Sequence, residues 1–360
     1  MKTILVAIEF PPAFGGVETY YAKLAEYWPD EFAVITNQSN ELLSKGLPFL
    51  KWSKAVGTIL KTVKNSKPDW LIAGEILPIG TAMWLVSFFT SYKYAVVLHG
   101  LDFALATRSP FKRWLSKKIL TRANKIISAN SKTVEELAKF LKDSSRIVVV
   151  NPGVDPEKPM VRPGLAAALR ANYGLDYLNV IITIARLVPR KGIDTMLSIL
   201  PQILETCPNT AYVIIGKGPD EHRLKEMMRD PALSGKVFIM TDTTDEEKWA
   251  WLEISDIFSM PTREIGTDYE GFGIVYLEAN LFSKPVVATN SGGVKDAVSD
   301  HVNGLLIPSN NSDALAKALI DLLQDKNLRE SLGQKGKERF VTDFAWSKQV
   351  SLFYNALKNN

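Results

Sequence analysis

From residue 3 to residue 151 the chain alternates short apolar runs with stretches whose apolar residues recur at helical spacing. The runs are rich in β-branched and aromatic side chains and predict strands, whereas the stretches at 17–28 and 133–141 predict amphipathic helices. The predicted strands are residues 3–10, 32–37, 70–75, 94–100, 125–130 and 147–151. Near-continuous apolar strands separated by helices favour a parallel sheet that is covered on both faces.

The alternation stops at 152–164, a proline-rich segment that is the best candidate for a linker between domains. It then restarts, with predicted strands at 180–186, 211–216, 237–241, 257–261 and 285–290. The predicted helices of this half are 192–206, 220–229, 246–255, 272–282, 313–323 and a last amphipathic helix at 344–357. The pattern therefore predicts an α/β fold of two doubly wound, Rossmann-like domains, whose ligands bind beyond the carboxyl ends of the strands.

Length and composition fit this picture. The 360 residues, 46% hydrophobic and 23% charged, are typical of a soluble globular protein of about two domains. Cys207 is the only cysteine, so no internal disulfide can form and a reducing cytosol is expected. The uncharged run 76–92 contains Pro78 and Gly80, and is predicted to be a buried strand-to-helix segment rather than a membrane span. Glu9 interrupts the apolar N-terminus, so no signal peptide is expected.

Positive charge is concentrated in two segments of the first half. Residues 42–68 and 108–125 contain several Lys and Arg and no Asp or Glu, with aromatic residues interleaved. Such stretches suit an anionic membrane surface, and an ordinary solvated helix face is an equal alternative. We expect a cytoplasmic protein, with peripheral binding to the inner face of the cell membrane as the option that these segments raise. No nucleic-acid-binding module accompanies the charge, so nucleic acid is not expected as a partner.

Candidate chemistry is densest at residues 270–278, which read Glu-Gly-Phe-Gly-Ile-Val-Tyr-Leu-Glu. Gly271 and Gly273 leave the backbone bare where the free N–H groups of a helix N-terminus attract phosphates and developing oxyanions. Glu270 lies on the loop before this helix and Glu278 about two turns into it. This spacing suits a ligand that is anionic in the middle and rich in hydroxyls at both ends, as a nucleotide sugar is. From these residues alone, an acidic residue favoured by the helix dipole and a surface glutamate are the alternative.

Two strand-to-helix loops of the first half carry glycines or titratable groups. Gly15 and Gly16 precede the first predicted helix and would let a ligand approach the backbone, although a tight turn is the simpler interpretation of them taken singly. His99 ends a predicted strand, a position better suited to a cleft than to a core, and a structurally bonded histidine is the alternative. Asp102 belongs to the same loop and is either a cleft residue or a turn residue.

The second half contains two further loops of this kind. Arg186 and Lys191 stand at opposite ends of one loop and could converge on a diphosphate, whose negative charge grows as its bond to a sugar breaks. Arg190 is interpreted as a solvated turn residue. The next loop offers a backbone surface on which a flat base could lie, at Gly216, Lys217 and Gly218. The chain has no Asp-x-Asp pair and its histidines are far apart in sequence, so we expect Arg186 and Lys191 to take the place of a metal ion.

With these residues assembled, the chain resembles the GT-B glycosyltransferases, specifically the large retaining family 4, and among them the bacterial phosphatidylinositol mannosyltransferase type. The resemblance covers nearly the whole chain, and its most specific element is the Glu-x7-Glu motif from Glu270 to Glu278. Supporting elements are Gly15-Gly16-Val17-Glu18, His99-Gly100, Asn151-Pro152-Gly153-Val154-Asp155, and Arg186 with Lys191-Gly192. The resemblance implies two domains that face a cleft, with residues 1–158 and 344–360 binding the acceptor and residues 159–343 binding the donor. The last helix would cross back to the first domain.

The resemblance also implies a role for each candidate residue. Arg186 and Lys191 would bind the donor diphosphate, and Glu278 would bind the ribose hydroxyls. Glu270 would contact the donor sugar, helped by the backbone N–H groups of Phe272, Gly273 and Ile274. His99 would lie by the reacting sugar, and further backbone contacts to the phosphate and the base would come from Gly15, Gly16, Gly216, Lys217 and Gly218. Leu101 departs from the residue that the mannosyltransferase type often carries after His99-Gly100, which leaves the acceptor assignment open.

We therefore expect a retaining hexosyltransferase that needs neither a cofactor nor a metal and moves mannose from GDP-mannose to a hydroxyl of a lipid-linked or polysaccharide acceptor. A UDP-linked glucose or N-acetylglucosamine is the alternative donor. The expected mechanism is a front-face displacement, in which the departing diphosphate helps to accept the proton of the incoming hydroxyl. Two other classes are a sugar-binding protein without catalysis and an NAD-dependent oxidoreductase, which the lack of a Gly-x-Gly-x-x-Gly turn disfavours.

Overall fold

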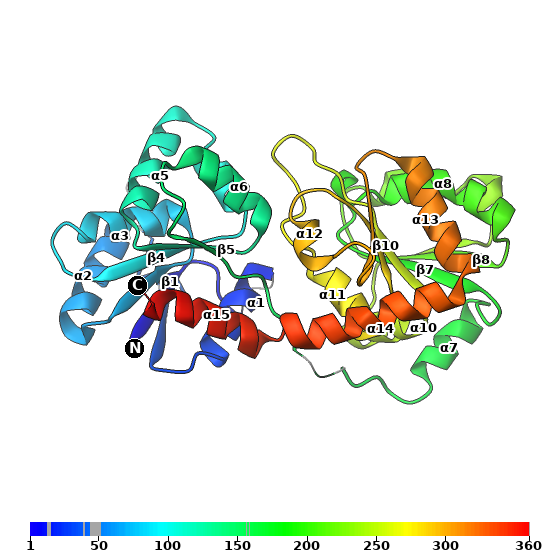
Figure 1. Ribbon diagram of the computed structural model, residues 1–360, viewed down its shortest axis with the longest axis horizontal. Helices are drawn as coiled ribbons and strands as arrows, with labels where there is room; N and C mark the ends of the chain where they lie inside the picture. The colour runs from blue at the N-terminus through cyan, green and yellow to red at the C-terminus, as the bar shows by residue number, and fades with distance from the viewer. Residues whose placement is uncertain (13–15, 39, 44–51, 156, 158, 360) are drawn as a thin grey trace. The chain divides into compact units, whose positions relative to one another are not determined.

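The structure is a computed structural model that describes residues 1–12, 16–38, 40–43, 52–155, 157 and 159–359. The chain divides into two compact units, and each contains one parallel sheet (Figure 1). The first unit is Met1–Gly153 with Trp346–Asn360, and the second is Val154–Ala345. The predicted α/β class, with two Rossmann-like sheets, is confirmed.

All six strands predicted for the first half are present, in the order β2-β1-β3-β4-β5-β6. In this parallel register Thr3 pairs with Phe32 on one side and with Trp70 on the other. Each strand ends before its predicted limit, because the chain leaves the sheet early for the loop that follows. The bounds are β1 Thr3–Ala7, β2 Phe32–Thr36, β3 Trp70–Ala73, β4 Lys93–Leu98, β5 Lys125–Ser128 and β6 Ile147–Val149.

Successive side chains of this sheet point to opposite faces, and each face has its own apolar core. Leu5 faces the core formed with α1 (Gly16–Glu26) and α15 (Trp346–Lys358). Ile4 faces the core formed with α2 (Ser53–Ser66), α3 (Thr81–Val86), α4 (Leu101–Ala106), α5 (Pro110–Arg122) and α6 (Ser131–Phe140). In α15, Trp346 packs edge to face on Tyr20, with ring centroids 5.7 Å apart. The last helix therefore returns to the first unit, as predicted (Figure 1).

The predicted buried segment at 76–92 is a π-helical turn, Ile76–Gly80, followed by α3. Ile76, Ile79 and Met83 are fully buried in the same core as Ile4, but Phe88 and Phe89, after α3, are exposed, so the segment is buried only in part. No helix in the described part of the chain is long and apolar enough to cross a membrane.

The second sheet is also parallel, in the order β12-β11-β10-β7-β8-β9. Five of its strands were predicted: β7 Asn179–Ile184, β8 Thr210–Ile215, β9 Val237–Met240, β10 Ile257–Met260 and β11 Val286–Thr289. The sixth, β12 (Gly304–Ile307), extends the sheet beyond β11. It was not predicted because its apolar run, residues 305–307, is only three residues long and lies between Gly304 and Pro308.

Helices cover both faces of this sheet. One face packs on α8 (Ile193–Thr206), α9 (Glu221–Met227) and α13 (Ser312–Gln324). The other packs on α7 (Leu165–Asn172), α10 (Asp245–Ile254), α11 (Ile274–Leu281), α12 (Val294–Ala297) and α14 (Lys326–Asp343). Helix α11 begins two residues later than predicted, at Ile274, and α7, α12 and α14 were not predicted.

The strand orders fix where each sheet opens for a ligand. In the first unit the chain places β2 on one side of β1 and continues on the other side with β3. In the second unit β8 and β9 lie on one side of β7, and β10, β11 and β12 lie on the other. Where the direction of winding reverses, the loops at the carboxyl ends diverge and leave a crevice. The crevices are therefore expected after β1 and β3 in the first unit, and after β7 and β10 in the second.

Candidate functional site

The loops on the two sides of the second switch point meet at Glu270. Glu270 follows β10 and is buried, with 8% of its surface exposed. Its Oε2 atom accepts hydrogen bonds from Lys191 Nζ and, at 2.9 Å, from Arg190 Nη1. Lys191 itself is only 9% exposed and belongs to the loop after β7. The fold thus brings together two of the predicted catalytic residues, Lys191 and Glu270, at the position where an open α/β sheet binds its ligand.

Opposing effects set the charge of Glu270. Burial alone would raise the pKa of its carboxyl group, but the neighbouring charges and hydrogen bonds of Lys191 and Arg190 outweigh burial and hold the pKa below its ordinary value. Glu270 is therefore an anion at neutral pH. A buried carboxylate with two cationic partners is costly to disrupt, because removing one partner leaves buried charge uncompensated.

Arg190 is not a solvated turn residue, so that interpretation of the sequence is wrong. Its guanidinium bridges two acidic groups, Glu270 and Asp268, and its Nε lies 3.2 Å from Asp268 Oδ1. Its backbone oxygen accepts a hydrogen bond from the backbone N–H of Arg263 at 2.8 Å. Arg190 thus joins the loop after β7 to residues 263–270. Its acidic partners lie nearly eighty residues away in sequence, which is why local pattern did not reveal them.

The segment that precedes Glu270 is tied on two sides. Arg263 Nη2 donates to Asp194 Oδ2, at the start of α8, at 2.7 Å. On the other side Glu264 Oε1 accepts a hydrogen bond from the backbone N–H of Gly292 at 3.0 Å, and the backbone oxygen of Glu270 accepts one from Gly293 at 2.8 Å. These contacts hold Glu270 in place through its backbone as well as through its side chain.

The N-terminus of α11 depends on Gly273. This residue has φ +80°, and a Cβ atom on it would lie 2.4 Å from the Tyr276 ring, so only glycine fits. Phe272 is buried against Phe344, with ring centroids 5.7 Å apart. No acceptor among the described residues takes the backbone N–H of Gly273 or Ile274. These groups remain available to an anion at the positive end of the helix dipole.

Glu278 lies within the second turn of α11, less deep than predicted, because the helix begins at Ile274. Its carboxylate forms an ion pair with Lys248 of α10 at 3.1 Å, and Lys248 also lies over the Trp249 ring, 3.7 Å from the centroid. The predicted contact of Glu278 with ribose hydroxyls stays a prediction.

The remaining donor-side residues lie at the carboxyl ends of β7 and β8. The Arg186 side chain is exposed and makes no ion pair within the described ranges. Lys217 pairs with Asp242 at 2.5 Å on the surface. Gly216 has φ +146°, and a Cβ atom there would lie 1.9 Å from the Ala185 oxygen, so glycine is required where the two loops touch. Gly218 completes the same turn.

In the first unit His99 follows β4 and is partly buried. Its Nε2 lies 3.0 Å from the Tyr21 hydroxyl. Its ring packs edge to face on the Tyr20 ring, with the centroids 5.1 Å apart. Burial lowers the pKa of His99 to about 4, so the imidazole is neutral at physiological pH. Gly16 begins α1, while Gly15 lies outside the described residues.

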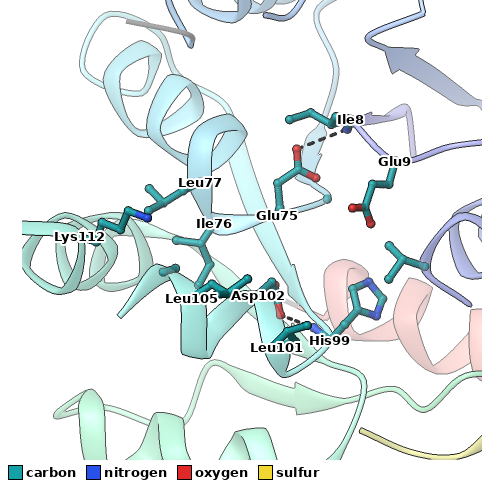
Figure 2. A pocket seen from close by; sticks show the side chains of 13 residues that line it. Ile8, Glu9, Glu75, Ile76, Leu77, His99, Leu101, Asp102, Leu105 and Lys112 are labelled. Atoms are coloured by element: carbon teal, nitrogen blue, oxygen red, sulfur yellow. Dashed lines mark hydrogen bonds between the residues drawn. The ribbon is translucent and has the colours of Figure 1, made fainter. Parts of the chain in front are cut away.

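His99 also lines a cavity of about 360 Å³ in the first unit (Figure 2). The cavity contains three carboxyl groups, those of Glu9, Glu75 and Asp102. Glu75 was not among the residues predicted from sequence, although it closes the predicted strand 70–75 directly after Gly74. An acidic residue at the carboxyl end of an apolar parallel strand is the signal that would have found it. In neither unit do the described residues place three or more His, Cys, Asp or Glu side chains so that they could share a metal ion.

Two family models match the chain, one in each half. The model "Glycosyltransferase Family 4" matches residues 14–158, and "Glycosyl transferases group 1" matches residues 168–339. The chain is 33% identical over 239 residues to a GDP-mannose-dependent alpha-(1-6)-phosphatidylinositol monomannoside mannosyltransferase of Mycolicibacterium smegmatis. That alignment covers 66% of this chain and 63% of the relative, slightly less than two thirds of its length. The GDP-mannose-dependent monoacylated alpha-(1-6)-phosphatidylinositol monomannoside mannosyltransferase of Corynebacterium glutamicum is 26% identical, over 99% of this chain and 98% of the relative.

Solved structures share the fold over the whole chain. Anabaena Alr3699/HepE, solved in complex with UDP, has a TM-score of 0.81 at 19% identity and is matched over 100% of both chains. A glycosyltransferase from Rickettsia africae has a TM-score of 0.83 at 19% identity, over 99% of this chain and 98% of its own. With its two parallel sheets and both family domains in order, the chain belongs to the GT-B glycosyltransferases, with a family 4 domain followed by a glycosyl transferases group 1 domain.

Proposed function

We propose that this protein transfers mannose from GDP-mannose to a hydroxyl group of a lipid-linked or glycan acceptor, with retention of configuration and without a metal ion. The observation that carries the proposal is the buried cluster of Lys191, Arg190 and Glu270 at the second switch point, next to the N-terminus of α11. The relatives from Mycolicibacterium smegmatis and Corynebacterium glutamicum are named as GDP-mannose-dependent enzymes, which supports the choice of GDP-mannose over other donors.

The cluster supplies both kinds of contact that a nucleotide sugar needs. Lys191 and the exposed guanidinium of Arg186 would neutralise the diphosphate, whose charge grows as the glycosidic bond breaks. The backbone N–H groups of Gly273 and Ile274 would add fixed positive ends of dipoles. Glu270, ionised and held from two sides, would accept hydrogen bonds from hydroxyls of the transferred sugar. Glu278 would bind the ribose.

The proposed displacement takes place on the face from which the diphosphate leaves. The acceptor oxygen forms its bond to the anomeric carbon as the bond to the diphosphate oxygen breaks, and the departing phosphate oxygen takes the acceptor's proton. His99 is neutral, and the Tyr21 hydroxyl donates its hydrogen to the backbone oxygen of Gly74. His99 Nε2 therefore donates to Tyr21, which leaves Nδ1 as a hydrogen-bond acceptor near the reacting sugar.

Nucleotide binding and donor turnover test this function. GDP is expected to raise the melting temperature more than UDP or ADP, because a selectively bound ligand stabilises the folded state. Lys191→Ala and Glu270→Ala are expected to lower hydrolysis and transfer of GDP-mannose by about a hundredfold or more. Lys335→Ala, an exposed lysine of the same unit, serves as the control. Selective stabilisation by UDP would replace the donor assignment, and undiminished turnover in both variants would refute the site.

A further inference from the structure

The first switch point holds a cavity whose two ends differ in chemistry. It is lined by residues that follow β1, β3 and β4, and by residues of α4 and α5. Figure 2 shows Glu9, Glu75 and His99 around one end, and Leu77 and Lys112 at the other. Apart from His99, none of these side chains has a place in the donor chemistry described above.

Hydrogen-bonding capacity is unused at the first end. Glu75 Oε1 accepts a long hydrogen bond, 3.3 Å, from the backbone N–H of Ile8, while its other oxygen has no partner in the part of the chain that the structure describes. Asp102 Oδ1 accepts the backbone N–H groups of His99 and Gly100, both at 2.9 Å. Its Oδ2 is buried without a partner. Buried polar atoms are normally satisfied, so Asp102 Oδ2 favours a ligand that donates hydrogen bonds, and the partly buried Glu75 offers such a ligand a second acceptor.

The same groups disfavour an anion. Burial, together with the nearby charges of Glu9 and Asp102, raises the pKa of Glu75 to about 8. Burial raises the pKa of Asp102 to about 6. Glu75 is therefore largely protonated at neutral pH and can both donate and accept a hydrogen bond, as a sugar hydroxyl does. A phosphate beside these carboxyl groups would be repelled and would have few donors.

The other end of the cavity is apolar and opens to the surface. Ile76, Leu77 and Leu105 line it, and Leu105 is 50% exposed. Lys112 is the one cation among the described lining residues, and it lies at this end (Figure 2). An alkyl chain can therefore leave the cavity along Leu105, and an anionic group on it would meet Lys112 rather than Glu75.

We propose that this cavity selects an amphiphilic acceptor, binding its uncharged, hydroxyl-rich ring between Glu75, Asp102 and His99 and its apolar chain along Leu77 and Leu105. The inference rests on the proposed transferase function and adds the acceptor class to it. It assigns specificity to Glu75 and Leu105, which lie outside the donor site.

Direct binding to the full chain tests the inference with three probes that share one ring: hexyl α-mannoside, mannose and mannose 6-phosphate. Without nucleotide, hexyl α-mannoside is expected to bind about tenfold more tightly than mannose, and mannose 6-phosphate more weakly than mannose, by calorimetry or saturation-transfer NMR. Glu75→Ala should weaken both uncharged probes by about tenfold. Glu75→Gln, which keeps a donor and an acceptor, should restore most of that loss. Glu41→Ala, an exposed glutamate of the same unit, is the control.

Leu105→Asp separates the two ends and, because Leu105 is half exposed, does not threaten folding. It should reduce the affinity for hexyl α-mannoside to that for mannose and leave mannose itself unchanged. Binding of mannose 6-phosphate as tight as that of hexyl α-mannoside, no binding of hexyl α-mannoside, or unaltered binding in both Glu75→Ala and Leu105→Asp would overturn the inference. Stabilisation by GDP, measured on the same samples, reports on the donor site alone. The absence of stabilisation by GDP, UDP and ADP alike in the unmodified chain would contradict the transferase function, whatever the cavity binds.

Discussion

At the scale of single residues, the second unit is organised around one carboxylate. Glu270 accepts hydrogen bonds from Lys191 and Arg190, which lie on a loop almost eighty residues earlier in the sequence. Arg190 also forms an ion pair with Asp268. The described hydrogen bonds and ion pairs of the Arg190 side chain go to Glu270 and Asp268 and not to the N-terminal N–H groups of α11. We regard Arg190 as a positioning residue for Glu270.

Arg190→Ala is expected to lower the rate of transfer by about tenfold and to move the acid limb of the pH–rate profile to higher pH. The shift follows because Arg190 helps to hold the pKa of Glu270 below its ordinary value, so its loss raises that pKa. Arg190→Lys should move the acid limb part of the way back towards its original pH, because lysine keeps the positive charge but lacks the guanidinium that joins Glu270 to Asp268. Arg229→Ala, on an exposed ion pair, is the control. An unmoved acid limb in Arg190→Ala would contradict the positioning role.

Because the pKa of Glu75 is raised, we expect the stability of the fold to depend on pH. Its pKa is about 8 in the folded chain, against an ordinary value of 4.5, so folding favours the protonated form. The contribution of Glu75 to the free energy of unfolding is fully present below about pH 4.5 and is lost as the pH rises to about 8. Relative to the unmodified chain, Glu75→Gln should gain stability to urea across this window, on the order of a few kcal/mol, and level off above it.

Two neighbours that titrate in the same region, Asp102 and His99, are present in both proteins of that comparison. Burial raises the pKa of Asp102 to about 6 and lowers that of His99 to about 4. Their effects therefore largely cancel in the difference. A stability difference between Glu75→Gln and the unmodified chain that does not change with pH would mean that Glu75 is ionised in the fold.

At the scale of elements, most strands could be predicted because their signal is local. Runs such as β1 and β8 are buried on both faces, so their residues are apolar without interruption. β12 was missed because its apolar run, residues 305–307, is only three residues long. The start of α11 was placed too early because Phe272 continues the apolar pattern, whereas the backbone turns helical only after the left-handed Gly273.

The same difference between local and long-range signals decides which residues of the candidate sites could be predicted. Glu270, Lys191 and the glycines of the loops could be found from sequence, since each lies beside a strand end or a helix start. The partnership of Arg190 with Asp268, and the cavity around Glu75, could not. Both depend on which strands are neighbours, and the order of strands in a sheet is not written in the local pattern of any one of them.

Gly273→Ala tests the backbone geometry at the start of α11. The substitution places a Cβ atom in a left-handed conformation and 2.4 Å from the Tyr276 ring, so a loss of about 2 kcal/mol or more in the free energy of unfolding is expected by urea titration. Gly57→Ala is the matched control, because Gly57 lies inside α2 with nothing within 4 Å of an added Cβ. That change should stabilise the protein by about 0.5–1 kcal/mol. Equal effects of the two substitutions would show that Gly273 is not constrained.

At the scale of the whole molecule, the two units carry opposite chemistry at equivalent places. The second switch point offers cations and helix N–H groups, which suit a diphosphate, whereas the first offers carboxyl groups and a neutral histidine, which suit hydroxyls. The proposed transfer reaction would therefore use one unit for each of its substrates. The surface of α5 lies next to the apolar end of the cavity, at Lys112.

Helix α5 predicts binding to anionic membranes. Phe111 and Trp114 are 68% and 53% exposed, and their rings stack with the centroids 6.2 Å apart. The exposed cations around them on α5 are Lys112, Arg113, Lys117 and Lys118. Aromatic rings at a lipid interface and lysines at an anionic surface act together, and each cation near such a surface contributes about 1 kcal/mol. The protein is therefore expected to co-sediment with vesicles of phosphatidylcholine and phosphatidylserine, and not with phosphatidylcholine alone.

Added salt should weaken this binding, because the charges of α5 and of the membrane are both exposed to screening. Trp114→Ala and Lys117→Glu should each reduce the bound fraction severalfold, whereas Lys335→Glu, an equal change of charge on the second unit, should not. The comparison with Lys335 matters because the whole chain is basic, with a formal net charge of +4, and general attraction alone would respond to both lysines alike. Equal, negligible sedimentation with both kinds of vesicle would leave α5 as a solvated helix face.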